Sequence, residues 1–447
     1  MNNSAKKILL ISYHFPPSAA VGGLRSLNFA KTLPFLGWSP YILTIKEQYL
    51  DNIDKGRLEG LNGTKIFRTN LNPTILQGYL RFRSTYRKPS EPKDMEISFA
   101  SSGNGNIPAK SMLRRFKRYL LSIFFVLPDR ERNWVIPATL RALREIKHEK
   151  IDYIFTTCPP YSVHLIGLLL KMITGVKWIA DFRDPWMTTG SKRTYPTCLL
   201  SLKIERWLEK MVIQKSDMVT FNVERLKEEY KKKYNSQPSA KFVYIPNGFD
   251  PALFSRYKSL EKYDKFTLTY TGSLYVGRTP EPIFKAVKML VEDGRIDIQK
   301  VRIKLIGSCK NIDGAPTSRL IDYYSLEKVV ETLDTVPYSD ALEIVKKSHL
   351  ALLFAPNLQF QIPAKVYDYM GVGTKVLALA DEGATADFVN STGIGRAFRS
   401  SDISGIMEFI YQSFCNQESL GFERDASISG FKIKSVTQKL TDCLNRI

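Results

Sequence analysis

The sequence lacks the short motifs that mark several large enzyme classes. It contains no Walker A motif, no GxGxxG, no GxSxG and no HExxH. These absences argue against most P-loop kinases, dehydrogenases, α/β-hydrolases and zinc proteases. A DxD triplet, the usual sign of a nucleotide diphosphate clamped by a metal ion, is also absent. We therefore expect neither a metal site nor a separate cofactor.

Cysteine pairs and long apolar runs are missing as well. The five cysteines are scattered without a CxxC pair, which favours a reducing cytoplasm and no zinc site. No stretch approaches the roughly 18 apolar residues of a membrane-spanning helix. The N-terminal run ILLIS (8–12) is shorter than the core of a signal peptide and is followed by Pro16 and Pro17. It predicts a first buried strand, and the expected location is the cytoplasm.

Acidic residues are few relative to basic ones, and the net charge is +21. Such an excess suggests nucleic acid, a phospholipid surface or a phosphorylated substrate as partner. Between Arg81 and Lys150, sixteen basic residues stand against seven acidic ones. There, 113–127 (LRRFKRYLLSIFFVL) mixes basic with apolar side chains. This segment is either an interfacial segment, peripheral on the anionic inner face of the cytoplasmic membrane, or a basic helix packed on its domain. The periodicity of its apolar residues does not distinguish these two alternatives.

Nucleic acid is the least favoured of these partners. The sequence has no aromatic RNP-like strand and no recognition-helix motif. Phosphate-backbone binding would also leave the polar loops described below unexplained. We expect no nucleic-acid partner.

Short apolar runs alternate with helical patterns in the first half, which predicts a parallel sheet covered by helices. The strand candidates are 8–12, 40–44, 65–69, 152–157, 177–181, 218–222 and 242–246. The helix candidates are 24–36, 138–148, 161–174, 199–215 and 223–234. Residues 72–112, rich in Pro, Ser, Gly, Arg and Lys, interrupt the alternation and are interpreted as a mobile loop.

A second alternation follows, with strands at 266–272, 301–307, 350–356 and 375–380 and helices at 281–292, 318–326, 339–348 and 364–371. The predicted organisation is an N-terminal Rossmann-like domain with a basic insertion, a linker, a second Rossmann-like domain and a terminal helix. Their ranges are 1–245 (insertion about 72–127), 246–265, 266–429 and 430–447. Parallel sheets bind ligands at the carboxyl ends of their strands, so two facing sheets would form a cleft.

Polar loops follow several strands of the first half. Gly22 and Gly23 precede a helix whose first turn holds Arg25, which suits close approach of a phosphate or an acceptor; a simple tight turn is the alternative. In WIADFRDPW (178–186), Asp184 is a candidate wall of the sugar or acceptor site, and a local salt bridge is the alternative. His164 is either a catalytic or a structural histidine.

The second half has a more specific pattern. In TGSLYVGRTPEP (271–282), Gly272 and Ser273 form a turn after a strand, and Arg278 stands beside a helix start, which predicts a diphosphate cradle. Pro363 precedes a helix that carries Lys365 and Asp368 three residues apart. Lysine can neutralise a leaving diphosphate and the carboxylate can accept hydrogen bonds from a ribose, although an exposed ion pair is the simpler explanation.

Five blocks, in order, carry a family resemblance: ILLISYHFPPSAAVGGLRS, WIADFRDPW, YIPNGFDPALF, YTGSLYVGR and IPAKVYDYMGVGTKVLAL. With them the chain resembles, over nearly its whole length, the retaining glycosyltransferases of family 4 that make bacterial surface polysaccharides and glycolipids. The resemblance implies an α/β GT-B fold of two Rossmann-like domains, with the terminal helix crossing back to the first. It also implies a UDP- or GDP-sugar donor, a lipid-linked or saccharide acceptor and no essential metal.

Two positions depart from the family pattern. Where many members have two glutamates separated by seven residues, Asp368 matches the second but Phe360 occupies the first. The strand-end histidine of many relatives falls near Cys158, and His164 is a displaced candidate. A non-catalytic relative that serves as a membrane scaffold, or as partner of another transferase, is therefore the alternative function.

The expected chemistry follows from charge. Cleavage of the bond between sugar and diphosphate builds negative charge on the leaving group, which preorganised cations stabilise. Arg278 and Lys365 are the expected pair. In the family, the acceptor is thought to attack from the face of the departing phosphate, so a dedicated base need not exist.

Overall fold

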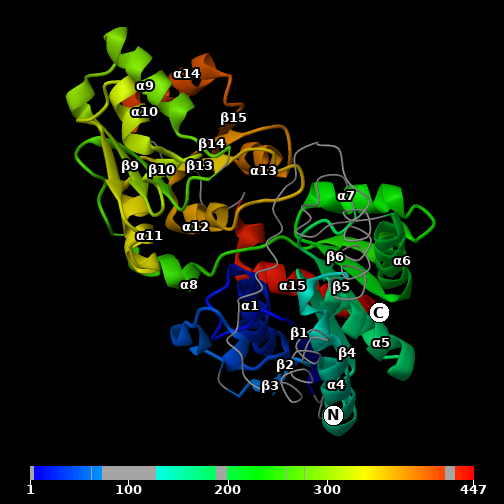
Figure 1. Cartoon of the computed structure of the whole chain (residues 1–447). Coiled ribbons are helices and arrows are strands. Elements are labelled where there is room, and N and C mark those ends of the chain that lie inside the picture. The colour runs from blue at the N-terminus through cyan, green and yellow to red at the C-terminus, as the bar shows by residue number, and fades with distance from the viewer. Residues whose placement is uncertain are drawn as a thin grey trace, which may run out of the picture. The chain divides into compact units, whose positions relative to one another are not determined.

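The computed structural model describes residues 5–61, 63–72, 127–187, 199–257, 259–275, 277–417 and 428–447. By its contacts the chain divides into two compact units (Figure 1). The first comprises Met1–Asn222, Tyr230–Tyr244 and Leu440–Ile447, and the second comprises Val223–Glu229 and Ile245–Lys439. Most of the basic insertion expected at about 72–127 lies outside the described residues.

The first unit is built on a seven-stranded, all-parallel sheet in the order β3-β2-β1-β4-β5-β6-β7. Its strands are β1 (Lys6–Ile11), β2 (Trp38–Ile45), β3 (Lys65–Thr69), β4 (Tyr153–Cys158), β5 (Lys177–Phe182), β6 (Met218–Phe221) and β7 (Phe242–Tyr244). Its helices are α1 (Leu24–Thr32), α4 (Val135–Glu149), α5 (Ser162–Thr174), α6 (Leu199–Lys215) and α7 (Glu224–Lys233), of which Glu224–Glu229 cluster with the second unit. The central strands β4 and β5 are almost entirely buried because helices cover both faces of such a sheet.

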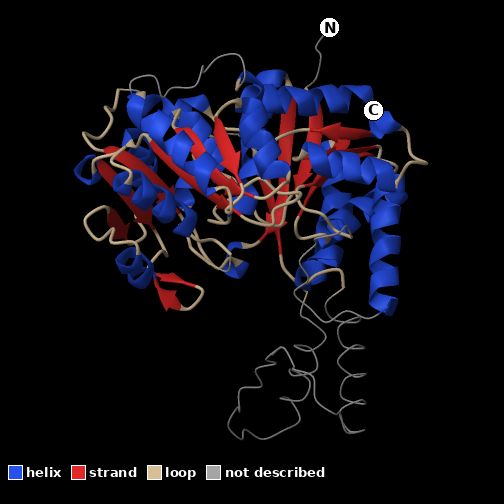
Figure 2. Cartoon of the chain, turned by 90° about the horizontal axis from the view of Figure 1, so that it is seen from above, coloured by secondary structure: helices blue, strands red, loops and turns tan. Residues whose placement is uncertain are grey.

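The second unit has a six-stranded parallel sheet in the order β12-β9-β8-β13-β14-β15 and a two-stranded antiparallel ribbon, β10-β11. Figure 2 shows the strands in red among blue helices. The strands are β8 (Phe266–Thr271), β9 (Val301–Ile306), β10 (Asn311–Ile312), β11 (Ala315–Pro316), β12 (Val330–Leu333), β13 (Leu350–Ala355), β14 (Lys375–Ala380) and β15 (Gly395–Phe398). The helices are α8 (Pro251–Phe254), α9 (Glu281–Glu292), α10 (Thr317–Tyr323), α11 (Tyr338–Lys347), α12 (Lys365–Val372), α13 (Ala384–Thr392) and α14 (Ile403–Cys415).

Two segments connect the units along the chain. Part of the segment expected as a linker packs in the second unit, where Phe254 and Tyr257 are buried in its core. The terminal helix α15 (Ile433–Arg446) starts among residues of the second unit, and its last residues belong to the first. There, the Lys6 ammonium donates a hydrogen bond to Asn445 at 2.8 Å.

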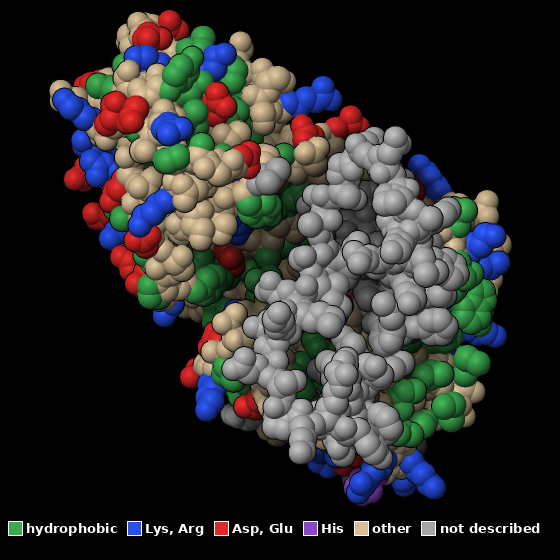
Figure 3. Space-filling model, in the orientation of Figure 1, with side chains coloured by type: hydrophobic (Ala, Val, Ile, Leu, Met, Phe, Trp, Pro, Cys, Tyr) green, Lys and Arg blue, Asp and Glu red, His purple; other side chains and the backbone are tan. Residues whose placement is uncertain are grey.

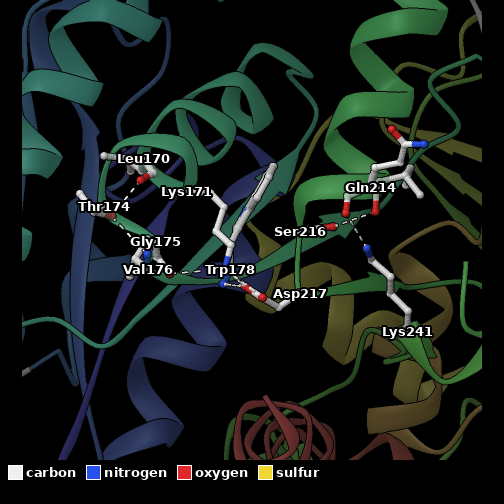
Figure 4. A network of polar contacts seen from close by, with 11 residues as sticks. Leu170, Lys171, Thr174, Gly175, Val176, Trp178, Gln214, Ser216, Asp217 and Lys241 are labelled. Carbon is white, nitrogen blue, oxygen red and sulfur yellow. Dashed lines mark hydrogen bonds and ion pairs between the residues drawn. The ribbon is translucent and has the colours of Figure 1, made fainter.

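The amino-terminal edge of the first sheet is held by Asp217, just before β6 (Figure 4). Its carboxylate accepts hydrogen bonds from the Lys171 ammonium at 2.7 and 2.9 Å and from the Trp178 backbone N–H at 2.7 Å. These bonds join the end of α5 to the start of β5. Ligands of parallel sheets bind at the opposite edge, where the strands have their carboxyl ends.

Within the part of the chain that is described, no helix is both long and apolar enough to cross a membrane.

Candidate functional site

Two glycine turns meet at the carboxyl edge of the second sheet. Gly272 follows β8 and Gly307 follows β9, with φ of 138° and 109°. A Cβ on Gly307 would lie 2.4 Å from the carbonyl oxygen of Gly272, and the Gly272 N–H donates to Ile306 O at 2.8 Å. A side chain at Gly307 would force the turns apart, so glycine keeps this edge compact and open to a ligand.

Lys365 begins α12 and extends toward the same edge. Its ammonium donates to the carbonyl oxygen of Thr271 and lies 4.4 Å from the ring centre of Tyr270. Burial, followed by the nearby charge of Arg278, lowers the pKa of Lys365 to about 8. The structure therefore brings together the two cations that the sequence singled out.

Arg278 stands in the loop after Gly272. Its guanidinium lies 4.2 Å from the ring centre of Tyr275, which holds the charge over an aromatic face. The neighbouring Ser273 is exposed, and its carbonyl accepts a hydrogen bond from the Tyr270 hydroxyl at 2.9 Å. The loop after Gly272 therefore contributes exposed backbone at Ser273 and the positive charge of Arg278 near Lys365.

Asp368 lies one helical turn after Lys365. Burial raises the pKa of Asp368 to about 6, and the Tyr338 hydroxyl donates to its carboxylate at 2.6 Å. Among the described residues, no ion pair joins Lys365 to Asp368, because the lysine is directed to β8 and the aspartate to α11. The i,i+3 ion pair that offered the simpler explanation is not formed.

Pro363 and Phe360 shape the chain before α12. The carbonyl of Pro363 accepts a hydrogen bond from the Val366 N–H at 3.1 Å, which starts the helix. Phe360, in place of the family's first glutamate, is buried. The Ala384 N–H binds the carbonyl of Gln359 at 3.0 Å, so this segment is tied to the start of α13.

In the first unit, the position predicted for Arg25 is wrong. Arg25 was expected beside an anionic ligand at the glycine loop, but it is buried in α1 and forms an ion pair with Asp181 of β5. Its Nε and Nη2 donate to the two carboxylate oxygens at 2.9 and 2.8 Å. Thr157 and Thr220 donate to the same carboxylate, each at 2.7 Å. The charge of Arg25 is therefore neutralised inside the core by Asp181.

Arg183 organises the glycine loop instead. Its guanidinium donates to the carbonyl of Gly22 at 2.6 Å and to those of Cys158 and Pro159 at 2.8 and 3.0 Å. Of the two aspartates that flank Arg183 and offered a local salt bridge as the alternative, Asp181 pairs with Arg25 instead. Arg183 joins the loops after β1 and β4 at the carboxyl edge of this sheet.

Gly22 and Gly23 lie in the turn before α1. A Cβ on Gly23 would stand 3.0 Å from the carbonyl oxygen of His14, so the turn packs closely on the end of β1. Asp184 is half-buried in the turn after β5. The glycine loop and the Asp184 turn are therefore parts of one edge of this sheet.

His164 lies in the core of the first unit. It is fully buried in α5, and burial lowers its pKa to about 3. Trp178 Nε1 donates to the Thr156 hydroxyl at 2.8 Å, which leaves that hydroxyl to donate to His164 Nδ1, also at 2.8 Å. A neutral ring with no exposed surface fits the structural alternative rather than the catalytic one.

One group of residues on α4 has the spacing of metal ligands: Glu145, His148 and Glu149. Its carboxylates already have partners, since Glu145 pairs with Arg141 and Glu149 with Lys65. We assign no metal to this group.

The comparisons with known proteins agree with this architecture. Residues 98–253 match the model of the family described as Glycosyltransferase Family 4. Over this segment the chain is similar to glycosyltransferase family 4. No curated protein matches the sequence.

Solved structures of GT-B glycosyltransferases share the fold over the whole chain. Sucrose-phosphate synthase from Thermosynechococcus elongatus is 14% identical, with a TM-score of 0.61 and coverage of 99% of this chain and 98% of its own. Anabaena Alr3699/HepE in complex with UDP-glucose is 13% identical, with a TM-score of 0.59 and coverage of 99% of this chain and 100% of its own. The apo form of the lipopolysaccharide outer core galactosyltransferase WaaB is 12% identical, with a TM-score of 0.55 and coverage of 98% of this chain and 99% of its own. Identities this low establish the fold alone.

Three residues of these edges were not predicted from the sequence: Gly307, Tyr338 and His14. Gly307 directly follows β9 and Tyr338 begins α11, neither within a recognisable motif, and only the fold places them at Gly272 and Asp368. His14 ends the SYH segment after β1, and its ring would lie 3.4 Å from a Cβ on Gly22. Burial, and then the charge of Arg183, lower the pKa of His14, so its ring is neutral at neutral pH. Its position after a strand was the one signal available.

Proposed function

We propose that the protein transfers a sugar from a nucleotide-diphosphate sugar, UDP- or GDP-linked, to a lipid-linked or saccharide acceptor in the synthesis of a surface polysaccharide: capsule, lipopolysaccharide or exopolysaccharide. The observation that carries the proposal is the cluster of Arg278, Lys365 and Asp368 around the Gly272 turn. No metal or further cofactor enters the proposal. We place the reaction at the inner face of the cytoplasmic membrane.

Each residue of the cluster has a separate role in donor binding. The backbone at Gly272 and Ser273 lets the diphosphate approach, and Arg278 and Lys365 supply the positive charge. Ionised Asp368 accepts hydrogen bonds from the ribose hydroxyls. In this proposal a ribose hydroxyl takes over the hydrogen bond that the Tyr338 hydroxyl donates to Asp368.

The reaction proceeds with retention of the anomeric configuration. The acceptor oxygen forms a bond to the anomeric carbon on the face from which the diphosphate leaves, and the bond between that carbon and the diphosphate oxygen breaks. The acceptor proton passes to the departing phosphate. Arg278 and Lys365 stabilise the charge that develops on the leaving group.

The proposal is tested by nucleotide binding and turnover together. UDP, GDP, UDP-glucose and GDP-mannose should be screened for thermal stabilisation, since a ligand that binds the folded state raises its melting temperature. The stabilising nucleotide-sugar is then assayed for release of its nucleotide with lipid-linked and saccharide acceptors. Asp368→Asn should reduce the stabilisation, whereas Asp322→Asn, at an exposed site on α10, should not. An absence of stabilisation by every nucleotide would contradict the proposal.

The alternative function is a non-catalytic partner of another transferase, and the buried Phe360 favours it. It predicts nucleotide-induced stabilisation without nucleotide release across the acceptor panel. Turnover with any acceptor rejects it.

The pKa values of the cluster predict a pH dependence of donor use. Below a pH of about 6 Asp368 is protonated and loses its full capacity to accept ribose hydrogen bonds, and above about 8 Lys365 loses its charge. We therefore expect kcat/KM for the donor to rise to a maximum between these values and fall on both sides. Asp368→Asn should remove the acidic limb, and an unchanged acidic limb would show that another group causes it.

A further inference from the structure

Three neighbouring helices of the first unit expose an unusual number of apolar side chains. α5 contacts both α4 and α6, so the three form one layer. Seven of the fifteen large exposed hydrophobic residues in the described part of the chain lie on them: Ile136, Leu140, Met172, Ile173, Leu199, Leu200 and Trp207. Each of the seven is at least 54% exposed. Figure 3 shows hydrophobic side chains gathered over α5 and α6.

The exposed charges of the same helices have one sign. The exposed ionic side chains of α4 and α6 are Arg144, Lys147, Lys203, Arg206, Lys210 and Lys215. The four glutamates of these helices point away from solvent: Glu145, Glu205 and Glu209 are buried, and Glu149 is partly buried against Lys65. By contrast, α9 of the second unit exposes Glu281 and Glu292 together with Lys285.

Apolar and basic residues alternate along the solvent side of α6. Leu199, Lys203, Trp207 and Lys210 follow one another at intervals of three or four residues, so they share one face of the helix. On α4, Ile136 and Leu140 are followed on the same face by Arg144. Leu and Trp inserted among Lys and Arg suit the boundary between lipid head groups and acyl chains. Nucleic acid would use the positive charge but not the leucines.

We propose that this solvent face of α4, α5 and α6 is the surface by which the protein binds a bilayer that contains anionic lipids. The apolar side chains enter the interfacial region, and the six basic residues pair with lipid phosphates. This assigns membrane contact to described helices of the first unit, independently of 113–127, of which only Leu127 is described. The inference rests on the proposed function only in that a lipid-linked acceptor would be met at such a surface.

Trp207 provides a direct probe of the surface. It is 57% exposed, whereas the other four tryptophans of the chain are at most 4% exposed. The purified full-length protein should be mixed with vesicles of phosphatidylcholine alone or with one quarter phosphatidylglycerol, at low and high salt. With the anionic vesicles at low salt we expect a blue shift of the tryptophan emission and quenching by lipids brominated in the acyl chain. Trp207→Phe should abolish the quenching while leaving sedimentation with vesicles largely intact.

A matched pair of variants tests the surface itself. Leu199→Ser combined with Ile173→Ser should lower the fraction sedimented with anionic vesicles by about tenfold or more, because two exposed apolar anchors are lost. Phe35→Ser combined with Tyr323→Ser removes two large side chains elsewhere, 81% and 78% exposed, and should leave sedimentation unchanged. Charge is tested by Lys203→Gln, Arg206→Gln and Lys210→Gln together, which should abolish the preference for anionic over neutral vesicles.

Several outcomes would overturn the inference. They are no sedimentation of the wild-type protein with anionic vesicles, equal losses in both double-serine pairs, or quenching that persists in Trp207→Phe. Binding to an acidic protein or to nucleic acid without binding to vesicles would assign the face to that partner. The assay requires no nucleotide-sugar, and Lys365→Ala should bind vesicles normally, so failure here is distinct from failure of the proposed activity.

Discussion

Replacing Lys365 by alanine is expected to reduce turnover by roughly 10²-fold or more while the protein stays folded. The ammonium lies at the Gly272 turn, with Arg278 close enough to depress the pKa of Lys365. Placing two cations together is unfavourable in the free protein, and a bound diphosphate relieves this repulsion. Loss of Lys365 removes the charge closest to the strand edge, where the leaving group would carry its negative charge.

The measurement is nucleotide release from the active nucleotide-sugar under saturating acceptor. Lys285→Ala, at an exposed site on α9, is the matched control and should keep full activity. Lys365→Arg keeps the charge, but its longer planar group does not fit the contact with the Thr271 carbonyl, so an intermediate loss is expected. Full activity of Lys365→Ala would remove Lys365 from the site.

The alternating pattern of the sequence was sufficient to predict two parallel α/β units. The fully buried strand β13 is a continuous apolar run, and the helix predicted at 281–292 coincides with α9. The edge strands β12 and β15 were not predicted. Each has four residues and is only partly buried, so neither carries the hydrophobic signal of a central strand.

The grouping of Lys365 and Asp368 near the Gly272 turn was more predictable than the contacts at the edge of the first sheet. Lys365 and Asp368 share one helix, and the turn at Gly272 directly follows a strand, so local spacing was enough. Arg25 could not be assigned in the same way, because its partner Asp181 is 156 positions away and only the fold brings them together. The sequence pattern of a charged residue near a glycine loop is the same whether its side chain faces a ligand or the core.

The buried pair of Arg25 and Asp181 is expected to contribute strongly to the stability of the first unit. Asp181→Ala is expected to lower the free energy of unfolding of the first unit by about 3–5 kcal/mol, because it leaves the Arg25 guanidinium buried without its counter-charge. Thr157 and Thr220 lose their common acceptor as well. The pKa of Asp181 is lowered by Arg25 and the hydroxyl donors against the effect of burial. Its stabilising contribution is therefore present above the pKa of an unfolded aspartate and is lost as the pH falls through the lower pKa of the folded state.

Tryptophan fluorescence isolates the relevant transition, since all five tryptophans lie in the first unit. Urea unfolding followed by this signal should show the loss in Asp181→Ala. Lys65→Ala, which breaks the pair of the exposed Lys65 with Glu149 in the same unit, serves as a control for the loss of a surface ion pair and should change stability much less than Asp181→Ala does. Combining Asp181→Leu with Arg25→Met should recover part of the loss, because no uncompensated charge then remains. If the single variant is as stable as the wild type, the pair is not a structural anchor, and Arg25 is again a candidate to meet a ligand.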